Sequence, residues 1–128
     1  MRKLFLILSL MMVMALFATA CGGGEAEEPE APASTGDATA GEPLFNSTCS
    51  ACHGPDAKGM PNLGKDLTTS EFLKERSDAE MLDFILIGRT AGDPLNDTGV
   101  DMPPRGGNPA LSNDDIYDII AYLRTLEE

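Results

Sequence analysis

The stretch Cys49-Ser50-Ala51-Cys52-His53 is the most informative feature of this chain. Two thiols three positions apart, followed directly by a histidine, form the pattern through which a c-type haem is attached. Each thiol can add to one vinyl group of the macrocycle, and the adjacent histidine then lies beneath the iron as an axial ligand. The pattern therefore predicts that Cys49, Cys52 and His53 bind one covalent haem.

Three other kinds of site also use paired cysteines. A zinc site needs about four ligands, but the chain has three cysteines and one histidine, so a carboxylate would have to complete the set. A redox dithiol of the thioredoxin type requires a βαβ context, and no strand pattern precedes Cys49. A structural disulfide is the third alternative. The pattern favours haem over all three.

The first twenty residues have the features of a secretory signal peptide. Arg2 and Lys3 give a positive start, an apolar run occupies residues 4–17, and the small residues 18–20 follow. This run is short for a transmembrane helix. We therefore expect residues 1–20 to be removed, with an uncleaved anchor helix as the alternative.

Cys21, directly after Ala18-Thr19-Ala20, resembles the lipid-attachment cysteine of bacterial lipoproteins. The resemblance implies cleavage before Cys21 and acylation of its thiol and new amino terminus. Several acyl chains hold a protein stably at a membrane where one chain is marginal. We expect a lipoprotein anchored to a bacterial membrane outside the cytoplasm. A secretory signal followed by a spare cysteine is the alternative.

The segment after Cys21 is predicted to be a flexible acidic linker that reaches residue 40. Residues 22–40 contain three consecutive glycines and no bulky apolar residue, so they cannot bury enough surface to fold. About 20 residues at ~5–6 Å × √n give an r.m.s. reach of roughly 25 Å. Residues 41–128 remain for one small folded domain.

The charge of the mature chain is strongly negative. All 21 acidic residues follow Cys21, and loss of Arg2 and Lys3 leaves seven of the nine basic residues, which gives a formal charge of −14. This charge argues against nucleic acid as a partner. It would steer a redox protein with a basic docking face toward the chain.

Hydrophobic periodicity predicts helices and loops in the domain, and no strands. We expect a first helix over residues 42–52 and a short helix over residues 70–76. The capping boxes Ser77–Glu80 and Ser112–Asp115 open two further helices, and the earlier of these ends at Gly88. Residues 53–67 and 89–111, rich in glycine and proline, are predicted to be loops.

These features together resemble a class I c-type cytochrome from about residue 40 to the C-terminus. The matching residues are Gly41 and Phe45 in the first helix, the haem-attachment motif, Pro61-Asn62-Leu63, a late Met102-Pro103, and Ala121-Tyr122-Leu123 in the last helix. The resemblance implies a small all-α fold around one haem. It implies that Gly41 and Phe45 meet Ile119 and Tyr122, and that the Pro61 carbonyl accepts the proton of His53 Nδ1, which would orient the ring.

Three methionines remain after cleavage as candidates for the second axial ligand of the iron. Met81 belongs to an apolar helical stripe and is expected in the core. Met60 lies close to His53 in sequence, on the side where Pro61 is needed. Met102 lies in a proline-rich loop that can reach the other haem face, and the family resemblance points to it as well. We expect Met102 to be the ligand, with Met60 or no protein ligand as alternatives.

Ligation by histidine and methionine suits outer-sphere electron transfer, because both axial positions are filled. We therefore expect a membrane-tethered carrier of single electrons in a respiratory or photosynthetic chain, and not an enzyme. It would connect a quinol-oxidising complex to an oxidase, a reaction centre or another carrier. Residues 99–109 are similar to the monohaem lipoprotein subunit of alternative complex III, which implies the alternative of a fixed subunit.

The second functional hypothesis is a haem-based ligand sensor or a small redox enzyme. Such a protein needs an open or labile sixth position on the iron. Arg105, which follows Met102, is expected either to reach a haem propionate or a partner, or to be an ordinary solvated loop residue.

Overall fold

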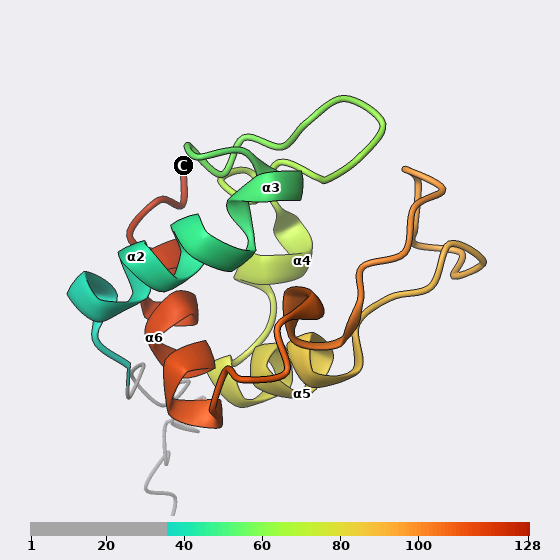
Figure 1. Ribbon diagram of the computed structural model, residues 1–128. Coiled ribbons are helices and arrows are strands. Elements are labelled where there is room, and N and C mark those ends of the chain that lie inside the picture. The colour runs from blue at the N-terminus through green and yellow to red at the C-terminus, as the bar shows by residue number, and fades with distance from the viewer. Residues whose placement is uncertain (1–35) are drawn as a thin grey trace, which may run out of the picture. The chain divides into compact units, whose positions relative to one another are not determined.

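The computed structural model describes residues 36–128. The predicted signal peptide, Cys21 and most of the predicted linker lie outside the described residues. Within residues 36–128 the chain forms five α-helices and one short 3-10 helix, and no strand (Figure 1). The prediction of an all-α domain is confirmed.

The first and last helices of the described part pack against each other. α2 spans Ala38–Thr48 and α6 spans Asn113–Arg124, and the two lie side by side (Figure 1). A Cβ atom on Gly41 would lie 1.9 Å from the carbonyl oxygen of Asp118, so only glycine permits this approach. The buried ring of Phe45 lies 5.6 Å from that of Tyr122, centre to centre. The predicted contact of these two helices is confirmed.

α2 begins four residues earlier than predicted, within the segment that the composition assigned to the linker. Asp37 caps the helix by accepting a hydrogen bond from the Thr39 N–H at 2.8 Å. The Asp37 N–H donates to the carboxylate of Asp118 on α6 at 2.7 Å. The residues after the cap are small and show no hydrophobic periodicity. The sequence pattern therefore did not predict this first turn of the helix. α3 spans Ser50–His53 and continues the chain after α2.

The remaining helices begin at the caps that the sequence indicates. α4 spans Glu71–Lys74 behind Ser70, and α5 spans Asp78–Ile87 with both hydrogen bonds of the Ser77–Glu80 box present. α5 ends at Gly88, whose φ is +77°. The Ser112–Asp115 box opens α6 in the same way. The predicted loop over residues 89–111 contains one short 3-10 helix, η1, at Pro104–Gly107.

The apolar core lies around α6, which packs against α2 and α5, and includes Leu73 from α4. Its fully buried large side chains are Phe45, Leu73, Ile116 and Ile120. A polar network at the edge of this core connects two helices. Arg124 on α6 forms an ion pair at 3.0 Å with the buried carboxylate of Asp78 at the start of α5. Arg124 also donates to the carbonyl oxygens of Leu73 and Arg76, so one side chain joins α6 to α4 and to the segment that follows α4.

Candidate haem site

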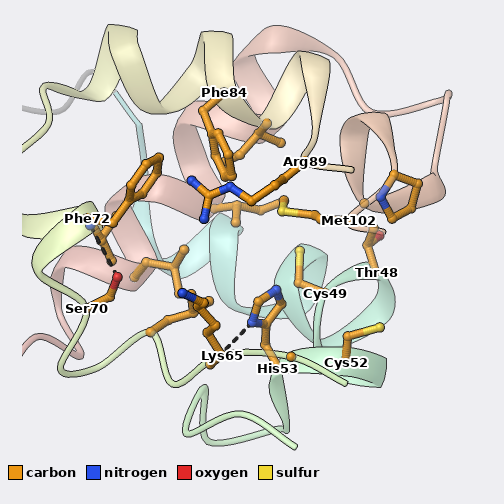
Figure 2. A pocket seen from close by; sticks show the side chains of 18 of the residues that line it. Thr48, Cys49, Cys52, His53, Lys65, Ser70, Phe72, Phe84, Arg89 and Met102 are labelled. Atoms are coloured by element: carbon orange, nitrogen blue, oxygen red, sulfur yellow. Dashed lines mark hydrogen bonds between the residues drawn. The ribbon is translucent and has the colours of Figure 1, made fainter. Parts of the chain in front are cut away.

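A cavity of about 430 Å³ lies beside the core. This volume falls in the range of roughly 300–1,000 Å³ that is typical of cofactor sites. Its walls come from the α2–α3 segment, from the loop after α3, from α4, α5 and α6, and from the loop before α6. The predicted residues Cys49, Cys52, His53 and Met102 all line it, and Figure 2 shows their side chains together. Sequence positions 53 residues apart are thus brought to one site.

The main chain fixes the orientation of His53. Its Nδ1 lies 2.9 Å from the carbonyl oxygen of Lys65. A carbonyl can only accept a hydrogen bond, so Nδ1 carries the proton and Nε2 is left as the lone-pair donor that a metal requires. Such a bond also makes the imidazole a stronger ligand.

The prediction that Pro61 provides this carbonyl is wrong. Leu63 N–H donates to the carbonyl of Met60 at 3.1 Å, and Asn62 has a φ of +60°, so Pro61 and Asn62 are the middle residues of a tight turn. Pro61 is exposed at the tip of this turn and does not line the cavity. The chain returns to the histidine only after Gly64, where a Cβ atom would lie 2.2 Å from the carbonyl oxygen of Cys52. That approach brings Lys65 to the ring.

Cys49 and Cys52 do not form a disulfide with each other in the structure. The alternative of a structural disulfide is therefore not supported. Burial, together with the nearby Cys52, raises the pKa of the Cys49 thiol to about 11. A zinc site would need a further ligand beside Cys49, Cys52 and His53. Among the described residues no group of three or more His, Cys, Asp or Glu side chains is placed to hold a metal ion.

The main chain also holds Met102. Its N–H donates to the carbonyl of Arg89, and the Arg89 N–H donates to the carbonyl of Met102, both at 2.8 Å. A Cβ atom on Gly88 would lie 2.2 Å from the Met102 carbonyl oxygen, so the end of α5 presses directly against this segment. Met60, by contrast, is 43% exposed and does not line the cavity. Met81 lines it from α5 and is a buried core residue.

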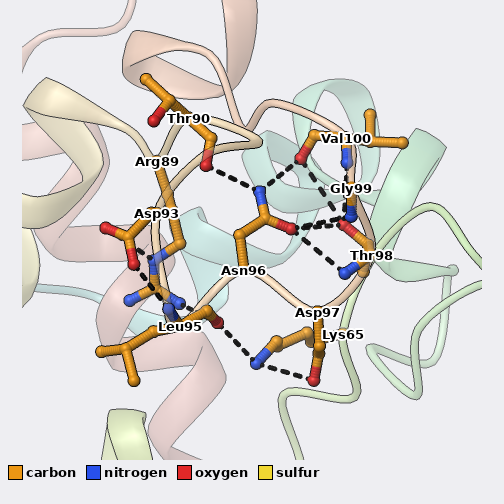
Figure 3. Close-up of polar contacts among 10 residues, drawn as sticks. All are labelled: Lys65, Arg89, Thr90, Asp93, Leu95, Asn96, Asp97, Thr98, Gly99 and Val100. Atoms are coloured by element: carbon orange, nitrogen blue, oxygen red, sulfur yellow. Dashed lines mark hydrogen bonds and ion pairs between the residues drawn. The ribbon is translucent and has the colours of Figure 1, made fainter.

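The loop before Met102 is organised around Asn96 (Figure 3). Its side-chain N–H groups donate to the carbonyls of Thr90 at 3.0 Å and Val100 at 2.8 Å. Its side-chain oxygen accepts from the N–H groups of Thr98 and Gly99. Sequence analysis did not single out Asn96, although asparagine in a loop rich in glycine and proline is the residue type that forms such local bonds.

Lys65 connects this loop to the wall that carries the histidine. Its ammonium group donates to the carbonyl of Leu95 at 3.1 Å and pairs with Asp97 at 3.1 Å (Figure 3). Arg105 fastens the other end of the loop by donating to the carbonyl of Leu111 at 2.6 Å and to Asn113 at 3.3 Å. Met102 is therefore held on a loop that is fixed at both ends and in its middle.

The residues of the cavity fit a c-type haem. Thiols for two vinyl groups and an imidazole with a free Nε2 come from one segment, and a thioether comes from another. The side chains of Phe45, Phe72, Leu73, Phe84 and Ile119 supply apolar walls for a macrocycle. One buried cationic nitrogen, Arg89 Nε, has no hydrogen-bond partner among the described residues, which suits a cofactor that carries carboxylates.

Comparison with known proteins identifies the family of the chain. The family model for cytochrome c matches residues 38–127. The CcoP subunit of the cbb3-type cytochrome c oxidase of Rhodobacter capsulatus is 33% identical over 96 residues, which cover 74% of this chain and 31% of that subunit. The chain thus spans about a third of the length of this relative.

The chain matches almost the whole of one further relative and a small part of another. Cytochrome c-555 of Chlorobaculum thiosulfatiphilum is 25% identical over 87 residues, which cover 68% of this chain and 93% of that protein. The FixP subunit of the cbb3-type oxidase of Bradyrhizobium sp. (strain ORS 278) is 41% identical over 54 residues, 41% of this chain and 19% of that subunit. No solved structure matches the chain.

Proposed function

The chain belongs to the cytochrome c family, as the match over residues 38–127 shows, and from that premise we propose that it is a membrane-tethered carrier of single electrons. Cys49 and Cys52 would attach one haem covalently, and His53 and Met102 would be the protein ligands of its iron. The chain passes electrons from a quinol-oxidising complex to an oxidase, a reaction centre or another carrier. In this role it is an electron-transfer protein and not an enzyme.

The observation that carries this proposal is the convergence of His53 and Met102 on one cavity beside the two thiols (Figure 2). When bound, the haem supplies a metal centre that can change its oxidation state by one electron. The chain contributes the ligand pair, a proton held on His53 Nδ1 by the Lys65 carbonyl, and apolar walls that exclude water. A thioether ligand favours the reduced iron and so raises the reduction potential.

The way in which Met102 is held supports electron transfer over ligand sensing. A sensor needs a sixth ligand that leaves easily. The Met102 main chain makes two hydrogen bonds to Arg89, and its loop is fastened by Asn96 and Arg105. A ligand held this firmly keeps small molecules from the iron and limits the rearrangement that accompanies a change in oxidation state.

The partners follow from charge and from the relatives. The strongly acidic mature chain would be steered toward a redox protein with a basic docking face. The CcoP and FixP relatives are, by name, subunits of an oxidase. Their similarity supports a redox complex as the partner, and it is compatible with the chain being a fixed subunit of one.

The membrane tether rests on Cys21. No helix within residues 36–128 is long and apolar enough to cross a membrane. We infer that acylation of Cys21 anchors the protein outside the cytoplasm. A Cys21→Ser variant should appear in the soluble fraction with the absorption spectrum of the wild type. A variant that stayed on the membrane after a salt wash would contradict lipid anchoring at this residue.

The test of the haem and its ligands is a pair of absorption spectra of the purified protein, reduced and oxidised. A c-type α-band in the reduced protein establishes covalent haem. The weak long-wavelength band of methionine-bound ferric haem establishes the second ligand. A c-type spectrum without that weak band, together with rapid binding of carbon monoxide, would favour the sensor. Absence of haem would refute the proposed function.

A further inference from the structure

Arg89 reaches into the cavity from the residue after α5 (Figure 2). Only 12% of its side chain is exposed. Its guanidinium carbon lies 4.5 Å from the centre of the Phe72 ring and 4.8 Å from that of Phe84. A cation so far removed from water needs anionic partners or hydrogen-bond acceptors to offset its lost hydration.

The chain itself supplies few of these partners. Nη1 donates to the carbonyl of Leu95 at 3.3 Å. Nε is buried and has no hydrogen-bond partner among the described residues. Asp93 forms an ion pair with Nε at 4.0 Å, but this is beyond hydrogen-bond distance and the Asp93 side chain is 39% exposed. A guanidinium has five N–H donors, so Arg89 retains capacity for an acceptor inside the cavity.

The other charged side chains around the cavity have partners elsewhere. Asp101 accepts from the Ala91 N–H, and Asp66 accepts from the backbone and hydroxyl of Thr68. Glu71 pairs with Lys74. The two cations, Lys65 and Arg105, bind the loop as described above. We therefore expect the molecule that fills the cavity to provide the hydrogen-bond acceptor for Arg89.

We propose that Arg89 binds a propionate carboxylate of the haem, an inference that rests on the proposed function. The vinyl groups and the propionates of the macrocycle lie on opposite edges. Cys49 and Cys52 fix the vinyl edge, and Figure 2 shows the Arg89 guanidinium on the Phe72 side of the cavity, away from Cys52. A guanidinium matches a carboxylate with two parallel hydrogen bonds.

This assignment gives Arg89 two tasks. Its main chain pairs with Met102, and its side chain holds one edge of the haem, so one residue would link the cofactor's position to that of the sixth ligand. Its positive charge also acts on the iron. Ferric haem carries one more positive charge than ferrous haem, so a nearby cation disfavours the oxidised form and raises the reduction potential.

The direct test uses nuclear magnetic resonance on the reduced, diamagnetic wild-type holoprotein, after its c-type spectrum has been recorded. We expect nuclear Overhauser contacts between the Arg89 side-chain N–H protons and the methylene protons of one propionate. Contacts from Arg89 to the Phe72 and Phe84 rings without any to a propionate would overturn the inference. The proposed function would fail differently, because the haem spectrum itself would be missing.

Three variants test the charge of Arg89 through the midpoint potential. Arg89→Gln should lower the potential, whereas Arg89→Lys, which keeps the charge, should lower it less. The matched control is Arg76→Gln, because Arg76 also stacks on Phe72, at 3.5 Å, but does not line the cavity. Equal shifts in the two Arg89 variants, or an Arg89→Gln shift no larger than the control's, would show that Arg89 acts only through packing and would overturn the inference.

Discussion

Nδ1 of His53 lies 2.9 Å from the main-chain oxygen of Lys65, while the ammonium group of Lys65 binds Leu95 and Asp97 in the loop that carries Met102. One residue therefore orients the proximal ligand with its backbone and fastens the distal loop with its side chain. The two walls of the cavity are connected at this point without any contribution from the cofactor.

Replacement of Met102 by alanine should lower the reduction potential and open the iron to external ligands. Loss of the soft thioether removes its preference for ferrous iron. Axial ligands move haem potentials over a span of ~0.8 V, so a fall on the order of 0.1 V or more is expected. Potentiometric titration and carbon monoxide binding measure the two effects.

The control for this experiment is Met60→Ala, because Met60 is exposed and does not line the cavity. Its potential should match that of the wild type. A large fall in the Met60 variant, with none in the Met102 variant, would transfer the ligand role to Met60.

The parts of the fold and site that could be predicted are those encoded in side-chain pattern. The boxes at Ser77 and Ser112 mark helix starts by their own hydrogen bonds. The contact of α2 with α6 at Gly41 and Phe45 was implied by the family resemblance and is present in the structure. The attachment motif placed Cys49, Cys52 and His53 on one segment.

The parts that could not be predicted depend on backbone positions. The carbonyl that faces His53 belongs to Lys65 because of the turn at Pro61 and Asn62, and a carbonyl leaves no signal in side-chain identity. The start of α2 is fixed by Asp37 bonding across to Asp118, 81 positions away in sequence. Burial of Arg89 against two phenylalanine rings likewise depends on tertiary packing.

Gly88→Ala should destabilise the protein and disturb Met102. The new Cβ would lie 2.2 Å from the Met102 carbonyl oxygen, on a residue whose φ is +77°. Backbone strain of this kind costs about 1–3 kcal/mol in the free energy of unfolding. Denaturant unfolding of the holoprotein measures the loss, and weakening of the methionine–iron band reports the displaced ligand.

Gly92→Ala is the matched control, because a Cβ there would meet no atom within 4 Å. The free energy of unfolding should stay within about 0.5 kcal/mol of the wild type, as for other surface substitutions. Equal losses in both glycine variants would mean that the contact between Gly88 and Met102 is not the cause.

Arg124→Met should be strongly destabilising. It leaves the Asp78 carboxylate, 9% exposed at its side chain, without its cation, and it removes the donors to the Leu73 and Arg76 carbonyls. Removing one partner of a buried pair costs about 3 kcal/mol or more. The control Lys58→Met breaks an ion pair to Glu128 whose two side chains are 53% and 58% exposed. The loss from Lys58→Met should be much smaller than that from Arg124→Met, because both partners of this pair are exposed. A similar loss in both variants would contradict the role of the Asp78–Arg124 network.

Acid should weaken the cap of α6 through Asp115. The Ser112 hydroxyl and then the Ser112 N–H donate to this carboxylate and lower its pKa in the folded protein. A folded-state pKa below the ordinary value of 3.8 contributes stability that is present above pH 3.8 and is lost as the pH falls through the folded-state pKa. Asp115→Asn should therefore flatten the dependence of unfolding free energy on pH below about pH 4.

Asp114→Asn, in the same helical turn but outside the capping box, is the comparison. If Asp114→Asn flattened the acid limb as much as Asp115→Asn, the effect would come from the charge near the helix start and not from the cap.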